Sequence, residues 1–452
     1  MSGRPHTQIF LASTLYGAAT LAAALDAGCF PPAGRRLLVI SNNAAVPETT
    51  PALDTMSGFD RVRGRFDGVV SWNEAIRPFH PGGWSPRADD VPLWERYLRL
   101  LWDLGADRVS LVVESIQVSP ALALAQLFPE APLDVYADGL MSYGPTRNKL
   151  DPLIGTRIGR LLHLDLVPGL TPLLLTEFGV APQTVPTGAF TEVLDELADA
   201  SGELDVPEGG ALLLGQYLSA LGILTPQEEE EMHVRMVRGA VGRGHRAVVF
   251  KPHPSAPARW SHLLEREAAA LGVELTVLER PVPAEVLYRR MRPALVVGCF
   301  STALLTAATF YGLPTARTGT GLLLERLTPY QNSNRVPVTL VDALVPGLTA
   351  DDDTHRPATV DAPDIGGLVT AVGYAMQHQI HPGLRPAAER YLAAHLDEHT
   401  WRYFKRRRLT ALALPGALPA QLSFIPRNAA VRRVARRARA VRRRLRKRAV
   451  TG

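Results

Sequence analysis

The first half of the chain alternates short apolar runs with segments whose apolar residues recur at helical spacing. Apolar runs of about four to eight residues are typical of buried strands, and a period of about 3.6 is typical of amphipathic helices. Strands are therefore predicted over residues 8–12, 37–41, 68–70, 108–114 and 133–136. Helices are predicted over residues 14–25, 94–104 and 120–128, the second with Leu93, Tyr97, Leu100 and Leu101 at helical spacing. Such alternation indicates a parallel α/β sheet.

The same alternation restarts in the second half. An acidic, glycine-containing stretch over residues 195–209 predicts a linker between the halves. Beyond it we expect strands at residues 211–214, 248–250, 273–277 and 294–297, and helices at residues 227–241, 260–271, 283–291 and 303–310. Thr225-Pro226 followed by glutamates is a typical helix start.

Two such halves predict an α/β protein with two tandem Rossmann-like domains facing a central cleft. This is the GT-B architecture of many nucleotide-sugar transferases. We expect an N-terminal domain over residues 1–200, on the acceptor side, and a C-terminal domain over residues 205–385, on the donor side. Residues 386–415 would form closing helices that cross back to the first domain. The 452 residues suffice for two domains of roughly 200 residues each.

The composition is that of a soluble globular protein, with 46% hydrophobic and 21% charged residues. Cys29 and Cys299 lack the spacing of a zinc site or a disulfide framework, which fits a reducing cytoplasm. The apolar segment at residues 15–25 is interpreted as the helix after the first strand, in preference to a signal peptide. No run of about 18 uninterrupted apolar residues predicts a membrane span. We therefore expect a cytoplasmic protein.

Lys251-Pro252-His253-Pro254 directly follows the predicted strand at residues 248–250. Parallel α/β sheets bind ligands outside the carboxyl ends of their strands, and the two prolines stiffen this loop. Lys251 adds positive charge, and a histidine can protonate or hydrogen-bond a departing phosphate near neutral pH. The alternative interpretation is a proline-rich turn with an incidental histidine.

Asp138 ends another predicted strand and is followed by Gly139. A carboxylate in this position can take a proton from an attacking hydroxyl. Glycine lets the backbone turn sharply and a ligand approach closely. Asp-Gly is also a common turn pair, so the pair alone does not distinguish a catalytic base from a turn.

Further candidates for binding a nucleotide lie in the second half. Ser301 and Thr302 fall at the start of a predicted helix, where hydroxyl groups and free backbone N–H groups can bind phosphate or simply cap the helix. Glu285 begins another helix; it could accept hydrogen bonds from ribose hydroxyls, although the helix dipole favours glutamate there without a ligand. Gly215 ends the strand at residues 211–214 and is assigned to the same donor site.

In their order along the chain, these residues resemble the motifs of bacterial sialyltransferases, and the nearest likeness is to the bacterial α-2,8-polysialyltransferase family. The likeness spans most of residues 8–400, although its motifs cover few positions. In that family an acidic-acidic-Gly motif supplies the base, and Asp138 with Gly139 matches its last two positions. Ala137 occupies the first acidic position, which puts the substrate in question more than the reaction type.

The remaining motifs extend the resemblance to the donor side. His253-Pro254 matches the family's His-Pro motif, and Ser301-Thr302 matches its serine/threonine motif. Lys251 and Glu285 lie where related enzymes hold the cytidine nucleotide. The resemblance implies a donor such as CMP-sialic acid and an inverting transfer to a glycan or glycolipid, with Asp138 as the base. It implies neither a separate cofactor nor a metal, because CMP leaves with a single phosphate.

The end of the chain is strongly basic. Residues 426–450 combine many arginines with an apolar stripe at helical spacing, formed by Val431, Val434, Ala438, Val441 and Leu445. An amphipathic basic helix of this kind fits an anionic membrane surface on the cytoplasmic side. The formal net charge of the chain is only +5, so the rest is net acidic, and no nucleic-acid module is recognisable. A membrane partner is therefore favoured over nucleic acid, and a solvated tail is the alternative.

Two other functions remain open on the sequence. One is a GT-B transferase that uses a UDP- or CDP-linked donor. The other is a non-catalytic nucleotide-binding protein that the basic tail recruits to a membrane. Neither the acceptor, the linkage, the particular nonulosonic acid nor the oligomeric state follows from the sequence.

Overall fold

The structure is a computed structural model that describes residues 5–253, 256–257, 259–353 and 364–417. Pro254 and the predicted basic helix at residues 426–450 lie outside these residues. Residues 1–403 form one compact unit, and the chain from residue 404 onward forms another. The described part of the second unit contains helix α16 (Arg406–Ala411).

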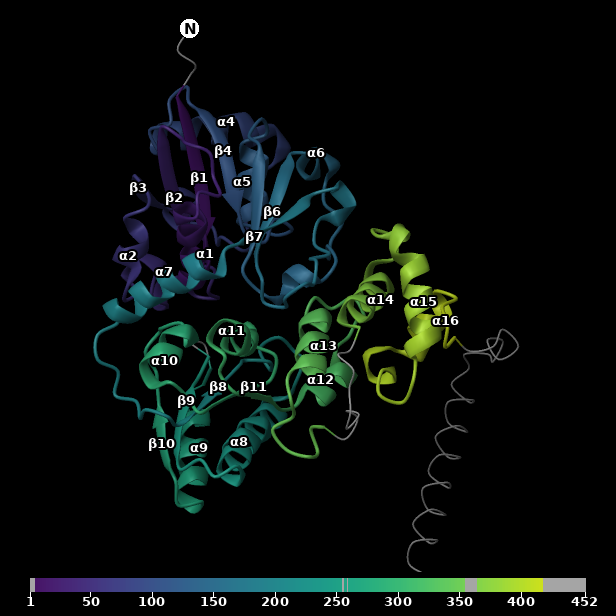
Figure 1. Ribbon diagram of the computed structural model, residues 1–452. Coiled ribbons are helices and arrows are strands. Elements are labelled where there is room, and N and C mark those ends of the chain that lie inside the picture. Colours follow the sequence, from purple (N-terminus) through teal and green to yellow (C-terminus); the bar gives the residue numbers. More distant parts are fainter. Residues whose placement is uncertain (1–4, 254–255, 258, 354–363, 418–452) are drawn as a thin grey trace, which may run out of the picture. The chain divides into compact units, whose positions relative to one another are not determined.

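The first unit begins with a seven-stranded sheet in the order β3-β2-β1-β4-β5-β6-β7, in which every pairing is parallel (Figure 1). Its strands are β1 (His6–Ala12), β2 (Arg35–Ile40), β3 (Gly68–Ser71), β4 (Arg108–Val113), β5 (Leu133–Ala137), β6 (Ile158–Leu164) and β7 (Ala181–Val185). Alternate side chains of a strand point to opposite faces. Ile9 and Leu11 accordingly enter one hydrophobic core, whereas Phe10 packs against Phe30 and Phe66 on the other face.

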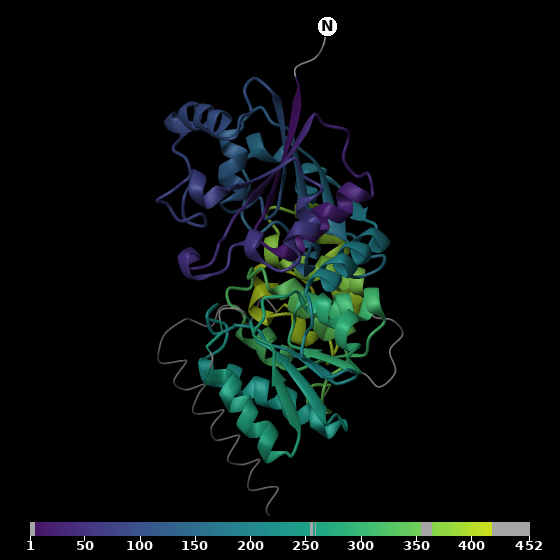
Figure 2. The ribbon, with the colours of Figure 1, turned by 90° about the vertical axis from the view of Figure 1, so that its left-hand side faces the viewer.

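Helices cover both faces of this first sheet (Figure 2). They are α1 (Leu15–Asp26), α2 (Phe59–Arg63), α3 (Trp72–Ala75), α4 (Val91–Leu101), α5 (Ala121–Leu127), α6 (Pro152–Gly155) and α7 (Thr187–Ala200). Helix α7 packs along α1 and also contacts α10 (Ala284–Met291) of the second half. The predicted linker at residues 195–209 is therefore wrong at its start, because α7 continues to Ala200 and buries Leu197 and Ala198.

The second sheet has five strands in the order β10-β9-β8-β11-β12, again all parallel. Its strands are β8 (Ala211–Leu214), β9 (Ala247–Lys251), β10 (Glu274–Val277), β11 (Leu295–Gly298) and β12 (Thr315–Arg317). The helices that accompany and follow it are α8 (Pro226–Gly242), α9 (Arg259–Ala270), α10, α11 (Thr302–Tyr311), α12 (Thr320–Arg326), α13 (Arg335–Leu344), α14 (Ile365–Gln377) and α15 (Arg385–His395). Two parallel, helix-covered sheets confirm the predicted α/β fold class with two Rossmann-like halves.

Several contacts join the two halves within the first unit. The Tyr16 hydroxyl of α1 lies 3.3 Å from the Thr306 hydroxyl of α11. The Arg290 guanidinium of α10 donates to the Ala198 carbonyl of α7. The side-chain amide of Gln377, at the end of α14, donates to the Arg147 carbonyl of the first half. The predicted closing region at residues 386–415 contains α15, a short 3-10 helix (Trp401–Tyr403) and α16, and the predicted domain limits stay a prediction.

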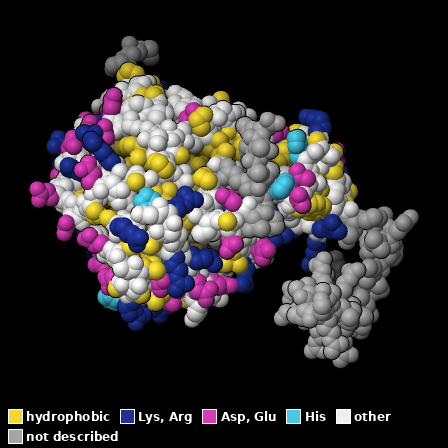
Figure 3. Space-filling view, turned by 60° about the horizontal axis from the view of Figure 1, so that its bottom comes forward, with side chains coloured by type: hydrophobic (Ala, Val, Ile, Leu, Met, Phe, Trp, Pro, Cys, Tyr) yellow, Lys and Arg dark blue, Asp and Glu magenta, His cyan; other side chains and the backbone are white. Residues whose placement is uncertain are grey.

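The remaining 3-10 helices are short and lie in connecting segments. They are η1 (Pro47–Thr49), η2 (Leu53–Thr55), η3 (Ala88–Asp90), η4 (Leu140–Tyr143), η5 (Thr176–Phe178) and η6 (Pro382–Leu384). Throughout the described part of the chain, every helix is too short or too polar to cross a lipid bilayer. On the face seen in Figure 3, side chains of both charges are interspersed, so this face carries no uniformly basic surface.

Helix α4 has the predicted helical periodicity, but its apolar face is not the face that packs inward. Leu93, Tyr97 and Leu100, which share one helical face in the sequence pattern, are 69%, 41% and 74% exposed. The residue that α4 buries completely is Leu98, which joins the core beneath the first sheet. The predicted helix therefore exists, but its apolar stripe faces solvent.

Candidate functional site

Two cavities open at the carboxyl ends of the strands, and each is lined from both halves of the first unit. The first, called here the Asp138 cavity, has a volume of about 490 Å³. The second, the His253 cavity, has a volume of about 380 Å³. The two share Ser301 and Thr302 as a common wall. Sites at the carboxyl ends of parallel strands are where α/β proteins bind their ligands.

Asp138 lies immediately after β5 and lines the Asp138 cavity. Burial raises the pKa of its carboxyl group to about 6. Gly17 in the first turn of α1 leaves room for it, since a Cβ atom at residue 17 would lie 3.3 Å from Asp138 Oδ2. A carboxylate with this pKa is ionised above about pH 6 and is basic enough to accept a proton near neutrality.

The common wall is the start of helix α11. Ser301 is its N-cap, and the Ser301 hydroxyl accepts a hydrogen bond from the Ala303 N–H at 3.3 Å. The Thr302 hydroxyl accepts one from the Leu140 N–H of the first half at 3.4 Å. Gly139 permits this approach, because a Cβ atom there would lie 3.1 Å from Thr302 Oγ1. The structure thus gives Gly139 the role of close backbone approach, with an ordinary extended backbone.

Lys251 and His253 lie at the end of β9 and line the His253 cavity. Partial burial and, secondarily, the charge of Lys251 lower the pKa of His253. The His253 ring stands 6.3 Å from the Tyr217 ring, centroid to centroid. Gly215 lines the same cavity and donates its N–H to the Lys251 carbonyl at 2.9 Å, which fixes the ends of β8 and β9 together.

Glu285 enters the His253 cavity from the first turn of α10 and is only 4% exposed. Burial raises the pKa of Glu285 to about 7, although the charge of Lys251 opposes this rise. The charge of Glu285 in turn opposes the lowering of the Lys251 pKa that burial causes. The two side chains therefore form a buried electrostatic pair beside His253.

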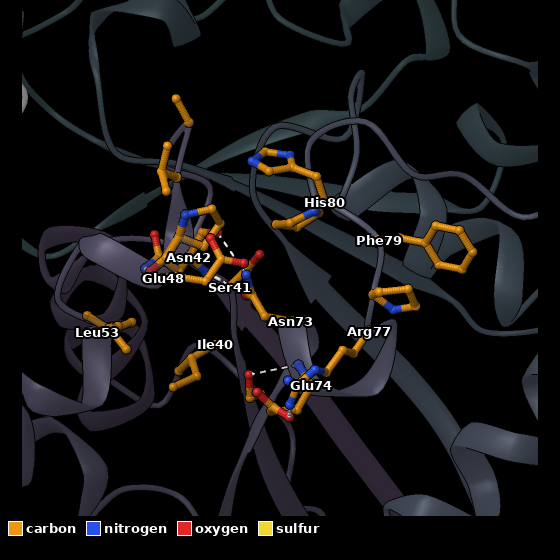
Figure 4. Close-up of a pocket in the computed structure, with 17 residues that line it drawn as sticks. Ile40, Ser41, Asn42, Glu48, Leu53, Asn73, Glu74, Arg77, Phe79 and His80 are labelled. Atoms are coloured by element: carbon orange, nitrogen blue, oxygen red, sulfur yellow. Dashed lines mark hydrogen bonds and ion pairs between the residues drawn. The ribbon is translucent and has the colours of Figure 1, made fainter.

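A third cavity, of about 610 Å³, lies at the ends of β2 and β3. Figure 4 shows Asn42 and Asn73 close together at its centre, with Phe79 pointing away. Each of these amides is already used: Asn42 donates to the Pro47 and Thr50 carbonyls, and Asn73 bonds the backbone of Asn42. These contacts hold the loop in shape and leave the amides little capacity for a ligand, so the larger cavity is the weaker candidate.

Comparison with known proteins identifies the family of this chain. A model of the family described as alpha-2,8-polysialyltransferase matches residues 8–320. The chain belongs to this family. As a polysialyltransferase family member it is a sialyltransferase-like glycosyltransferase, and the family implies a nucleotide-sugar donor and a glycan acceptor. No curated protein matches the sequence.

Solved structures similar to this polysialyltransferase family member are distant. The α/β-galactoside α-2,3-sialyltransferase of Photobacterium phosphoreum is 11% identical with a TM-score of 0.43, covering 75% of this chain and 95% of that chain. A sialyltransferase of Photobacterium damselae is 10% identical with a TM-score of 0.37, covering 74% and 96%. A UDP-GlcNAc 2-epimerase of Methanocaldococcus jannaschii is 10% identical with a TM-score of 0.43, covering 77% and 90%.

The described motif residues lie in the two cavities that share the common wall. The structure places Asp138 and Gly139 in the Asp138 cavity and places the donor-side residues Lys251, His253, Glu285 and Gly215 in the His253 cavity. Ser301 and Thr302 lie between these groups. The roles assigned to these residues stay predictions.

Sequence reasoning missed Glu114, which lines the Asp138 cavity at the end of β4. It also missed Ser13 and Tyr16, which follow β1 and line the His253 cavity. A signal for Glu114 was available: a carboxylate directly after a buried strand stands at the same sheet edge as Asp138. Glu114 was instead the last residue of the predicted strand at residues 108–114, and no chemical role was predicted for it.

Proposed function

We propose that this polysialyltransferase family member transfers a sialic acid or a related nonulosonic acid from its CMP-activated donor to a hydroxyl group of a glycan or glycolipid, with inversion. The observation that supports this proposal is the common wall: a cavity that contains the Asp138 carboxylate and a cavity that contains Lys251 and His253 meet at Ser301 and Thr302. An acceptor in one cavity and a donor in the other would have their reacting atoms near this wall.

Asp138 is the base in this mechanism. Its carboxylate takes the proton of the acceptor hydroxyl while the hydroxyl oxygen forms a bond to the anomeric carbon of the donor sugar. The bond from that carbon to the phosphate oxygen breaks, and CMP leaves with the bonding electrons. Because Asp138 and the donor residues lie in different cavities, attack from the side opposite CMP is favoured, which inverts the configuration.

The leaving phosphate would be stabilised by the residues of the His253 cavity. Since its pKa is lowered, His253 is mostly neutral near pH 7, so it acts as a hydrogen-bond donor more readily than as a proton donor. Lys251 contributes positive charge, and the hydroxyl groups at the start of α11 contribute further donors. In this proposal Glu285 accepts hydrogen bonds from the ribose hydroxyl groups.

The experiment that tests this proposal is CMP release from CMP-sialic acid in the presence of a sialylated glycan acceptor. We expect release by the wild type and a loss of at least about 100-fold in Asp138→Ala and in His253→Ala. Asp54→Ala and His262→Ala are matched controls at exposed positions outside all three cavities, and both should retain wild-type release. The anomeric configuration of the product, read by NMR, tests inversion.

A thermal shift measured with CMP separates the possible failures. Stabilisation by CMP without turnover would mean that the acceptor or the particular CMP-sugar is wrong. Turnover with a UDP- or CDP-linked donor in place of the CMP-sugar would replace the proposed donor class. Folded wild-type protein that neither binds CMP nor releases it would overturn the proposal.

A further inference from the structure

Three residues at the ends of neighbouring strands lie at the same edge of the first sheet as Asp138. Ser13 follows β1, Glu114 follows β4, and Tyr136 lies near the end of β5, and these strands are adjacent in the order β1-β4-β5. Val113 pairs with Val135, so the next residues, Glu114 and Tyr136, lie side by side.

Glu114 is held in one position by hydrogen-bond donors. Hydrogen bonding by the side chain and the backbone of Ser13 opposes the rise in the pKa of Glu114. The Tyr136 hydroxyl lies 3.4 Å from Glu114 Oε2 and 3.0 Å from the Leu11 carbonyl oxygen, so its single proton is shared between the two. Three donors directed at one carboxylate are an arrangement that favours the ionised form.

Asp138 lies two residues beyond Tyr136, on the same side of the chain as Tyr136 and Glu114. Both carboxylates line the Asp138 cavity. Burial and, next, the charge of Asp138 raise the pKa of Glu114 to about 7. The charge of Asp138 therefore acts on Glu114. Because such coupling between two ionisable groups is reciprocal, their apparent pKa values belong to the pair.

We propose that Glu114 is a positioning residue for the transfer: its anchored carboxylate places a second negative charge beside Asp138 and thereby increases the affinity of Asp138 for the acceptor proton. Ala137, the direct neighbour of Asp138 in the sequence, has no charge to offer. The second carboxylate comes instead from the adjacent strand. This inference rests on the proposed role of Asp138 as the base.

The other ionisable groups that act on Asp138 or respond to it come from three elements. They are Tyr136 of β5, Tyr16 of α1 and Glu285 of α10. Burial raises the pKa of both tyrosines well above the ordinary value, so they remain neutral over the working range. Among these three groups, Glu285 is the one whose charge changes near pH 7, and Glu285→Gln is the matched control. Arg147 also lines the Asp138 cavity and is left unchanged in every variant.

The test is the pH dependence of kcat/KM for CMP release between about pH 5 and pH 9. In the wild type we expect the acidic limb near pH 7, where the second carboxylate of the pair ionises. In Glu114→Gln the neutral amide lets Asp138 ionise at lower pH, so the limb moves toward pH 6. Asp138 becomes a weaker base, and kcat at pH 8 falls about tenfold or more.

Several readouts separate this role from a purely structural one. The KM for the donor and the thermal shift caused by CMP should be unchanged in Glu114→Gln, because Glu114 does not line the His253 cavity. Glu114→Asp keeps the charge and should keep the wild-type limb, and Glu285→Gln should change donor KM before it moves the limb. If Glu114→Gln does not fold, Ser13→Ala is the second variant. It removes one donor that favours the ionised form of Glu114, so the acidic limb should move to higher pH.

The outcomes distinguish this inference from the proposed function. A folded wild-type protein that neither binds CMP nor releases it, or an Asp138→Asn variant that retains release, overturns both. Release that depends on Asp138, combined with an unchanged acidic limb in Glu114→Gln, overturns only the role of Glu114. A uniform loss of activity at every pH, accompanied by a lower Tm, would make Glu114 a structural residue.

Discussion

Three carboxylates near the common wall, Glu114, Asp138 and Glu285, have raised pKa values, and burial is the largest cause in each. An acid whose pKa is higher in the folded than in the unfolded protein binds protons preferentially when folded. The folded state therefore loses stability as the pH rises from the unfolded pKa, near 4, through the folded pKa, near 6 to 7. These three buried carboxylates therefore cost the folded protein stability near and above neutral pH.

At the residue scale, this cost predicts that Asp138→Asn stabilises the protein while it abolishes transfer. The amide has a similar shape but carries no charge that burial would penalise. A shift from 3.8 to about 6 would correspond to about 3 kcal/mol, and because the side chain is only partly buried we expect about 1–2 kcal/mol at pH 8. Chemical denaturation of both proteins at pH 5 and pH 8 measures this difference.

The gain should be larger at pH 8 than at pH 5, since Asp138 is largely protonated in the folded protein at the lower pH. Asp54→Asn, at an exposed position, serves as the control and should change stability little at either pH. An Asp138→Asn variant that is less stable than the wild type at pH 8 would show that the Asp138 carboxylate contributes favourable contacts that outweigh its burial.

At the element scale, helix α4 offers two leucines with opposite environments. Leu98 is fully buried, whereas Leu100 is 74% exposed. We expect Leu98→Ala to lower the free energy of unfolding by about 2–5 kcal/mol, because it removes buried methyl groups and leaves a cavity. Leu100→Ala on the same helix should cost less than about 0.5 kcal/mol. Urea denaturation of the two variants measures both changes. Equal losses of unfolding free energy would mean that the exposed face of α4 is covered in solution.

Two of the strands that the sequence did not reveal, β6 and β7, share a physical reason. Strand β6 (Ile158–Leu164) carries Arg160 and His163 among its apolar residues, and the edge strand β7 (Ala181–Val185) is mostly exposed. Apolar runs mark strands that are buried on both faces, so these polar strands gave no signal. Buried strands such as β1 and β9 were predicted within two residues of their ends.

The sequence pattern predicted where helices occur better than it predicted which helix face packs inward. The sequence predicted α8 from Thr225-Pro226, and the structure shows a full capping box between Thr225 and Glu228. A local hydrogen-bond motif of this kind is decided within a few residues. Which face of α4 packs inward depends instead on the distant residues of the sheet, which a single segment cannot show.

At the scale of the whole molecule, the basic segment at the end of the chain predicts separable functions. Every cavity residue that the proposed reaction uses lies between residues 13 and 302. Deletion of residues 426–452 should therefore leave CMP release unchanged. It should abolish binding to anionic vesicles, because each basic residue near such a surface contributes ~1 kcal/mol.

Cosedimentation with vesicles of phosphatidylserine and phosphatidylcholine measures this binding, with vesicles of phosphatidylcholine alone as the control. Equal sedimentation of the full chain and the shortened chain would assign membrane binding to another surface or to none. A loss of CMP release on deletion would show that the tail acts on the site as well.

The sequence predicts the parts of the candidate site that follow directly after a predicted strand. Strand ends followed by Asp138 and by Lys251-Pro252-His253 identified two edges, and parallel sheets bring such edges to the ligand side. That Ser301 and Thr302 serve both cavities, and that Glu114 stands beside Asp138, depends on which strands are neighbours. Strand order is a property of the fold, so a linear pattern does not contain it.

The hydrogen bond from the Leu140 N–H to the Thr302 hydroxyl predicts an order of substrate binding for the proposed reaction. A hydroxyl that donates its proton to a phosphate oxygen becomes a better acceptor, so an arriving donor would strengthen this bond. The backbone next to Asp138 would then be drawn toward the nucleotide before an acceptor is present. The enzyme is accordingly expected to follow an ordered kinetic mechanism, in which the sugar nucleotide enters first and spent nucleotide leaves last.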